Sequence, residues 1–171
     1  GDPHILRQAG SCALKLRQYH HAQLYFQEAI KKGLSSIKNL ALLGFSFECQ
    51  ECWEEAEETY FQLIEQFPQH PAGYRGLAWL YGVGFSVHLE PKDGLFMAQQ
   101  AVKILPDVTS WELLSACEAR AGNFTKAHQI QEKLSQKSND KQQQKRCRKA
   151  MRALRKKMPL DTRFVSRILV A

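Results

Sequence analysis

The sequence predicts an all-α protein in which pairs of antiparallel helices stack one after another into a solenoid. The first observation is a recurrence with a period of 34 residues. The matched positions are Leu6, Ala9 and Gly10, then Leu40, Leu43 and Gly44, then Tyr74, Leu77 and Ala78. Farther along the unit, Ala22 and Phe26 correspond to Ala56 and Tyr60. A fixed period of this length indicates a repeated helical hairpin, because each hairpin buries its apolar face against its neighbours.

The second observation is the spacing of apolar residues within each unit. Leu40, Leu43, Gly44 and Phe47 lie at positions i, i+3, i+4 and i+7, which is one face of a helix. Small residues at Gly44 and Ala78 are expected where the two helices of a pair approach closely. Prolines end the second helices of the second and third units, because proline cannot continue the hydrogen-bond ladder. These prolines are Pro68, Pro71 and Pro106.

The pattern resembles the tetratricopeptide repeat family, whose unit has the same length and the same order of Leu-Gly or Leu-Ala and Ala-x3-aromatic positions. The resemblance covers a domain of residues 1–139 and implies a right-handed α-solenoid of about four repeats. The expected repeats are residues 3–36, 37–70, 71–107 and 108–139. The third has a longer link over residues 82–94 and resembles a Sel1-type repeat. The fourth is less regular, because Gln131 stands where an aromatic residue is usual.

The sequence after the repeats divides into two parts. Residues 140–158 are expected to form a basic helix that caps the solenoid, with a thin apolar stripe and a stop at Pro159. The stripe consists of Cys147, Met151, Leu154 and Met158. Residues 159–171 form an apolar tail, for which both helix and strand stay open. Its apolar residues include Phe164, Val165, Ile168 and Leu169.

The net charge of +7 is unevenly distributed along the 171 residues. Residues 137–158 hold ten Lys or Arg and one Asp, whereas residues 1–136 hold twelve basic and fifteen acidic residues. The basic patch comprises Lys141, Lys145, Arg146, Arg148, Lys149, Arg152, Arg155, Lys156 and Lys157. The sequence shows neither a membrane-length apolar run nor a secretory signal, and its five cysteines are odd in number. These features predict a cytoplasmic protein with reduced thiols.

No residue pattern predicts catalysis. Cys49 and Cys52 form a lone Cys-x-x-Cys pair, without the βαβ context of a redox site or the second ligand pair of a zinc site. The six histidines do not have metal-ligand spacing, and Gly82-Val83-Gly84 lacks the Lys-Ser/Thr of a phosphate loop. We therefore expect a protein that is not an enzyme and has no metal site or cofactor.

The resemblance instead implies a groove for a protein partner, lined by the first helix of each repeat. The residues mapped to this groove are Arg7, Ser11, Leu14, Lys38, Ala41, Phe45, Cys49, Arg75, Trp79, Val83, Glu112, Ala116 and Arg120. Phe45 and Trp79 would form an aromatic shelf beside a cationic row of Arg7, Lys38 and Arg75. Such a surface suits a peptide or helix with an apolar anchor and a carboxylate. The alternative is that Trp79 belongs to the core.

Other functions remain as alternatives to peptide binding. The first is a nucleic-acid-associated adaptor that uses residues 141–157, although no aromatic residue is interleaved among these cations to stack on bases. The second is a small bacterial secretion chaperone. The carboxylate clamp of chaperone-tail co-chaperones is not expected, because only Arg7 retains a charge at the matching positions. Those positions are Arg7, Ser11, Leu42, Ala72 and Gly76.

Overall fold

The computed structural model describes residues 1–160, and the tail positions from 161 to 171, including Phe164, Val165, Ile168 and Leu169, lie outside the described residues. The described part contains nine helices and no strand. The helices are α1 (Pro3–Lys15), α2 (Tyr19–Lys31), α3 (Ile37–Glu48), α4 (Trp53–Gln66), α5 (Pro71–Val83), α6 (Pro91–Ile104), α7 (Val108–Arg120), α8 (Phe124–Lys137) and α9 (Lys141–Arg155).

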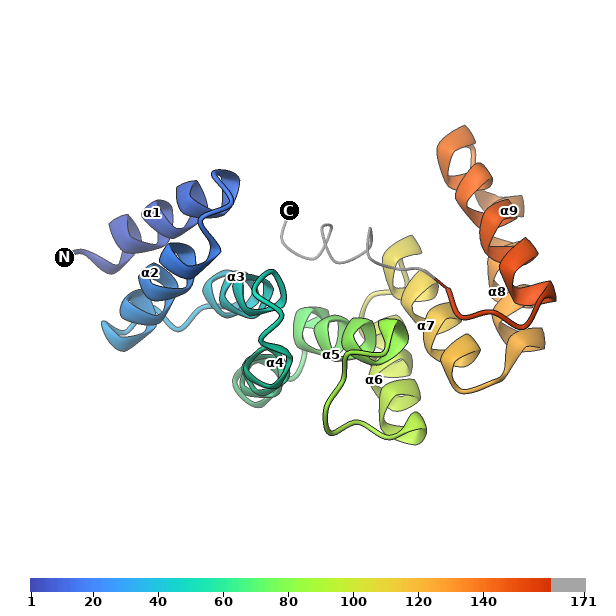
Figure 1. Ribbon diagram of the computed structural model, residues 1–171, viewed down its shortest axis with the longest axis horizontal. Helices are drawn as coiled ribbons and strands as arrows, with labels where there is room; N and C mark the ends of the chain where they lie inside the picture. The colour runs from blue at the N-terminus through green and yellow to red at the C-terminus, as the bar shows by residue number, and fades with distance from the viewer. Residues whose placement is uncertain (161–171) are drawn as a thin grey trace.

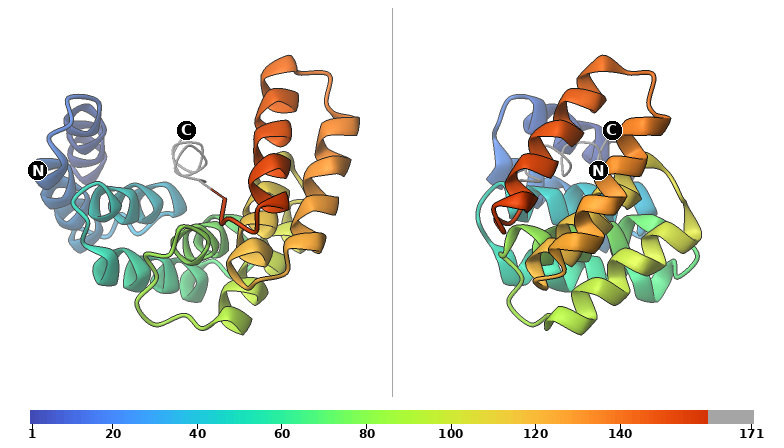
Figure 2. Two further views of the ribbon diagram at one scale, coloured as in Figure 1. Left: turned by 45° about the vertical axis from the view of Figure 1, so that its right-hand side comes forward. Right: turned by 90° about the vertical axis from the view of Figure 1, so that its right-hand side faces the viewer.

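Consecutive helices pack as antiparallel pairs, and the pairs stack side by side along the chain (Figure 1). The stack is curved rather than straight (Figure 2). In the left view of Figure 2, α3 and α5 lie on the inner side of the curve, whereas α4 and α6 lie on the outer side. The predicted all-α solenoid of helix pairs is therefore confirmed.

Close helix packing depends on glycine in the first helices. A Cβ atom added to Gly44 would lie 2.7 Å from the Tyr60 ring, and one added to Gly76 would lie 2.5 Å from the same ring. In the first pair, a Cβ on Gly10 would meet the Phe26 ring at 2.6 Å. The aromatic residues of α2 and α4 thus occupy the space that side chains on the neighbouring first helices would need. This is the physical reason for the Gly and aromatic positions of the repeat.

The link between α5 and α6 is longer than the other links and folds back onto α4. It begins at Gly84, whose φ of 86° is in the left-handed region that favours glycine. The carboxylate of Glu57, a fully buried residue of α4, accepts hydrogen bonds from the backbone N–H groups of Val87 and His88, at 3.0 and 3.1 Å. It also accepts one from the Ser86 hydroxyl at 2.9 Å. The Glu57 carboxylate therefore anchors the link to the preceding repeat.

The basic helix α9 packs along α8 on the inner side of the curve, where the first helix of another repeat would lie (Figure 2). Cys147 and Leu154 of the expected stripe are buried. The helix ends at Arg155, short of position 158, because the Lys156 and Lys157 N–H groups turn back to the carbonyls of Ala153 and Leu154. Met158 lies beyond this turn and is 52% exposed, so its expected place in the buried stripe is wrong.

Candidate peptide-binding surface

The predicted groove corresponds to the inner surface of the curve, because first helices of the pairs line that surface (Figure 2). Several groove residues are accessible in the structure. Arg7, Ser11, Leu14, Phe45, Cys49 and Val83 are partly buried, and Lys38 and Arg120 are exposed. Other mapped positions are inaccessible. Ala41, Trp79, Glu112 and Ala116 are buried.

Trp79 does not form an exposed shelf with Phe45. It is 4% exposed and belongs to the larger core cluster, with its ring centroid 6.4 Å from that of Phe85. Phe85 in turn stacks on Trp53 of α4, with 4.2 Å between centroids and 10° between the ring planes. The expected exposed aromatic pair is therefore wrong, and the alternative in which Trp79 packs near the α5–α6 link describes the structure. The Trp53 and Phe85 contact has no repeat signature and could not be found from the sequence pattern.

Arg75 is engaged within the solenoid. Its guanidinium forms an ion pair with Asp107 Oδ1 at 2.6 Å and donates to the Ser110 hydroxyl at 2.8 Å, which ties α5 to the start of α7. Burial alone would raise the pKa of Asp107, but hydrogen bonds from the Ser110 amide and from Arg75 outweigh it and lower that pKa. Arg75 thus holds two repeats together, and its expected place in a cationic binding row is wrong.

Glu112 is also turned into the protein. Its carboxylate is buried and faces Arg146 of α9, with 3.7 Å between Oε1 and the guanidinium. Burial raises the pKa of Glu112, and the Arg146 charge partly offsets that rise. This pair connects α7 to α9, so Arg146 differs from the rest of the basic patch in facing the body of the solenoid. Because Glu112 is buried against Arg146, its expected place in the groove is wrong.

Arg120 is the last residue of α7, and its side chain lies against the C-terminal end of α5. A Cβ atom at Gly84 would clash with the Arg120 guanidinium, so the two residues are in close contact. A cation at this position is favourable, because carbonyl groups leave the C-terminus of a helix with a partial negative charge. Arg120 remains exposed beyond this contact.

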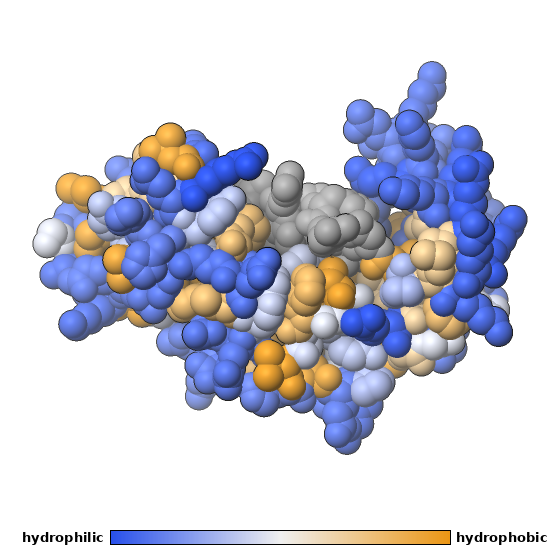
Figure 3. Space-filling model, in the orientation of Figure 1, coloured by the Kyte–Doolittle hydropathy of each residue, from blue (hydrophilic) through white to orange (hydrophobic). Residues whose placement is uncertain are grey.

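The other basic residues are turned to solvent. Lys141, Lys145, Arg148, Lys149, Arg152, Arg155, Lys156 and Lys157 are all exposed. Figure 3 shows the resulting hydrophilic surface over α8 and α9 at the right-hand end of the molecule. In the described range 1–160, no ion pair joins any of these eight residues to an acidic side chain.

The described residues contain no group of three or more His, Cys, Asp or Glu side chains that could hold a metal ion. Cys49 and Cys52 are both partly buried, and none of the five cysteines, all of which are described, forms a disulfide.

A buried titratable pair does occur at Glu48, which accepts a hydrogen bond from the Tyr60 hydroxyl. Burial raises the pKa of Glu48 to about 8, against the opposing effect of that hydrogen bond. No helix between residues 1 and 160 is both long and apolar enough to cross a membrane.

Comparison with solved structures identifies the fold. The chain is similar to TTC0263, a thermophilic TPR protein of Thermus thermophilus, with a TM-score of 0.68 and 17% identity over 89% of this chain and 80% of that one. It is also similar to the MamA RS-1 ArsTM double mutant, with a TM-score of 0.66 and 15% identity over 91% of this chain and 96% of that one. The chain therefore has a tetratricopeptide-type repeat fold. No protein-family model and no curated protein sequence matches it.

Proposed function

We propose that this protein is a non-catalytic protein-interaction module that binds a peptide or helix of a partner protein on its concave surface. The observation that carries the proposal is a cation and an apolar residue, spaced seven residues apart, on each of two neighbouring inner helices. Arg7 and Leu14 lie seven residues apart on α1, and Lys38 and Phe45 lie seven residues apart on α3. Positions i and i+7 share a helix face, so each helix offers a cation and, two turns later, an apolar residue.

This arrangement favours an elongated partner segment over a small molecule. The two residues of each pair are separated by about 10 Å along their helix, and α1 and α3 contact each other. A peptide with an acidic residue and an apolar anchor could meet both kinds of side chain at once. Val83 and Arg120, which are also accessible, would extend the surface toward α5 and α7.

Affinity capture from the source cells tests the proposal at low and at high salt. We expect a partner that the wild-type protein retains and that an Arg7→Glu/Lys38→Glu variant loses. A Lys141→Glu/Lys145→Glu variant is the matched control, since it makes the same charge change on exposed residues of α9. Loss of the partner from the control variant alone would contradict binding on the concave surface.

A second candidate, supported by the eight exposed cations of the basic patch, is association with nucleic acid through residues 141–157. Each phosphate contact releases counterions, so such binding would weaken steeply with salt. Titration of a fluorescent single-stranded oligonucleotide at several salt concentrations tests it. Binding that the Lys141→Glu/Lys145→Glu variant reduces and the Arg7→Glu/Lys38→Glu variant does not would favour this second function.

A further inference from the structure

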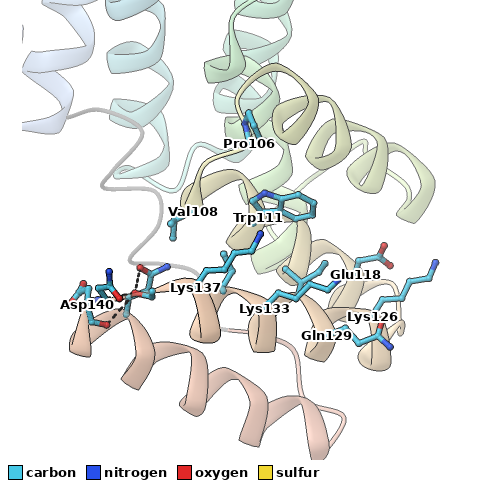
Figure 4. Close-up of a pocket in the computed structure, with 14 residues that line it drawn as sticks. Pro106, Val108, Trp111, Glu118, Lys126, Gln129, Lys133, Lys137 and Asp140 are labelled. Atoms are coloured by element: carbon cyan, nitrogen blue, oxygen red, sulfur yellow. Dashed lines mark hydrogen bonds between the residues drawn. The ribbon is translucent and has the colours of Figure 1, made fainter.

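An apolar recess lies between α7 and α8 and reaches the start of α9 (Figure 4). Its volume is about 670 Å³, within the usual range for ligand sites. Val108, Trp111 and Ile130 contribute apolar surface, and Leu134 lies beneath them. Val108 is 39% exposed despite its apolar side chain. We call this recess the Trp111 groove.

A row of lysines borders the Trp111 groove. Lys126, Lys133 and Lys137 lie at positions i, i+7 and i+11 of α8, which places them on one face of the helix. Figure 4 shows Lys133 and Lys137 extending from α8 on the side where Trp111 lies. All three are exposed, and within residues 1–160 no acidic side chain forms an ion pair with any of them.

The two acidic residues that line the Trp111 groove are engaged elsewhere. The Glu118 carboxylate accepts a hydrogen bond of 2.7 Å from the Asn123 side chain. The Asp140 carboxylate caps α9 by accepting a hydrogen bond of 2.8 Å from the Gln142 backbone N–H. Neither acid forms an ion pair with a lysine of the row within residues 1–160. The three ammonium groups outnumber the two carboxylates of the lining and are available to pair with a bound ligand beside the apolar floor.

We propose that the Trp111 groove binds an acidic amphipathic peptide segment of a partner protein. The three lysines span ~16 Å along α8, a length that matches about three turns of helix and exceeds the reach of a single carboxylate or phosphate. The floor of Val108, Trp111 and Ile130 takes the apolar side chains of the segment, and its carboxylates face the lysines. This site is separate from the proposed concave site, because its lining shares no residue with the set proposed there. That set is Arg7, Leu14, Lys38, Phe45, Val83 and Arg120.

The probe is a fluorescein-labelled helical peptide of roughly 14 residues, or ~21 Å, with Glu on one face and Leu on the other. Two companion peptides replace every Glu by Gln or every Leu by Ser. We expect the Glu/Leu peptide to bind the full chain and both companions to bind at least about tenfold more weakly. A Lys126→Glu/Lys133→Glu/Lys137→Glu variant should weaken binding about tenfold or more. The matched variant Lys141→Glu/Lys145→Glu/Lys149→Glu, with the same charge change on α9, should weaken it less than about threefold.

The indole N–H resonance of Trp111, assigned with a Trp111→Phe variant, reports where the peptide binds. It should shift on addition of the Glu/Leu peptide. No binding below about 1 mM, an equal effect of the two triple variants, or an unmoved Trp111 resonance would overturn the proposal. Tighter binding of an oligothymidine that moves the same resonance would overturn it in favour of a nucleic-acid site.

Discussion

The carboxylate of Glu57 holds the backbone of His88, 31 residues away, through a hydrogen bond of 3.1 Å to its N–H group. The neighbouring N–H of Val87 donates to the same carboxylate oxygen. Glu57 is fully buried on α4, so the α5–α6 link is held by a group that could not be left unpaired without a large desolvation cost. The link in turn carries Phe85, which stacks on Trp53 of the same helix.

We expect the Glu57→Ala variant to lower the free energy of unfolding by about 2–4 kcal/mol, because three donors of the link lose their common acceptor. Glu57→Gln, which keeps one carbonyl oxygen, should cost less. Chemical denaturation measures the loss, and hydrogen exchange at the Val87 and His88 amides shows whether the link has loosened. Glu54→Gln is the control, because Glu54 is an exposed acid 3.9 Å from His88 and should cost less than about 0.5 kcal/mol. Equal stability of the Glu57→Ala variant and the wild type would show that the link is not anchored in this way.

The buried Glu48 and Tyr60 pair predicts a pH-dependent stability. Burial raises the pKa of Glu48 from 4.5 to about 8, so between these values the folded state keeps a proton that the unfolded state has lost. The contribution of protonated Glu48 to the free energy of unfolding is complete below pH 4.5. It falls as the pH rises to about 8, by at most ~1.4 kcal/mol per pH unit. Glu48→Gln should remove this dependence. Denaturant unfolding of the wild type and the Glu48→Gln variant from pH 5 to 9 measures this dependence. If the free energy of unfolding changed with pH equally in both proteins, Glu48 would not be its source.

The contacts of Gly76 and Gly44 with Tyr60 predict a packing penalty for any larger residue. Gly76→Ala would place its Cβ 2.5 Å from the Tyr60 ring, which should cost about 1–3 kcal/mol despite the better helix propensity of alanine. Gly82→Ala is a matched control in the same helix, because its Cβ would meet the Ala116 Cβ at 3.2 Å. Thermal unfolding compares the two. A Gly76→Ala variant as stable as Gly82→Ala would show that the helix pairs tolerate wider spacing.

The packing of α9 predicts that this helix stabilises the last repeat. Leu154 is buried in a cluster with Ala116, Ala119 and Ala127, so Leu154→Ala should cost roughly 2–3 kcal/mol. Met158→Ala, at an exposed position beyond the helix, should cost less than about 0.5 kcal/mol. The measurement is urea unfolding of both variants. If Leu154→Ala were as mild as Met158→Ala, α9 would be a free basic arm and the nucleic-acid function would gain support.

The fold could be predicted from the sequence because its cause is local and periodic. Gly44 and Tyr60 are 16 residues apart, and the close packing between them follows from the repeat itself. The contacts of Glu57 with the α5–α6 link could not be predicted in this way. They join one repeat to an irregular segment of another. In the sequence, Glu57 is one of five glutamates between residues 51 and 58, and such a run at the start of a helix is typical of a solvated surface.

The candidate site was only partly predictable for a related reason. The repeat register places Trp79 and Arg75 on the first helix of their pair, but it does not say what neighbouring segments do there. Trp79 packs with the irregular α5–α6 link, and Arg75 meets Asp107, which caps the next helix pair. Arg7, Leu14, Lys38 and Phe45 remain accessible and are the residues on which concave binding now depends.

Site-specific photo-crosslinking in the source cells tests concave binding most directly. A benzophenone amino acid replaces Phe45 on the inner helix α3 or, as the control, Phe61 on the outer helix α4, which is 40% exposed. We predict a discrete crosslinked partner from position 45 that is absent from position 61 and lost when Arg7→Glu/Lys38→Glu is added. The same partner captured equally from position 61, or no partner from position 45 while the unmodified protein still retains one in affinity capture, would contradict binding on the concave surface.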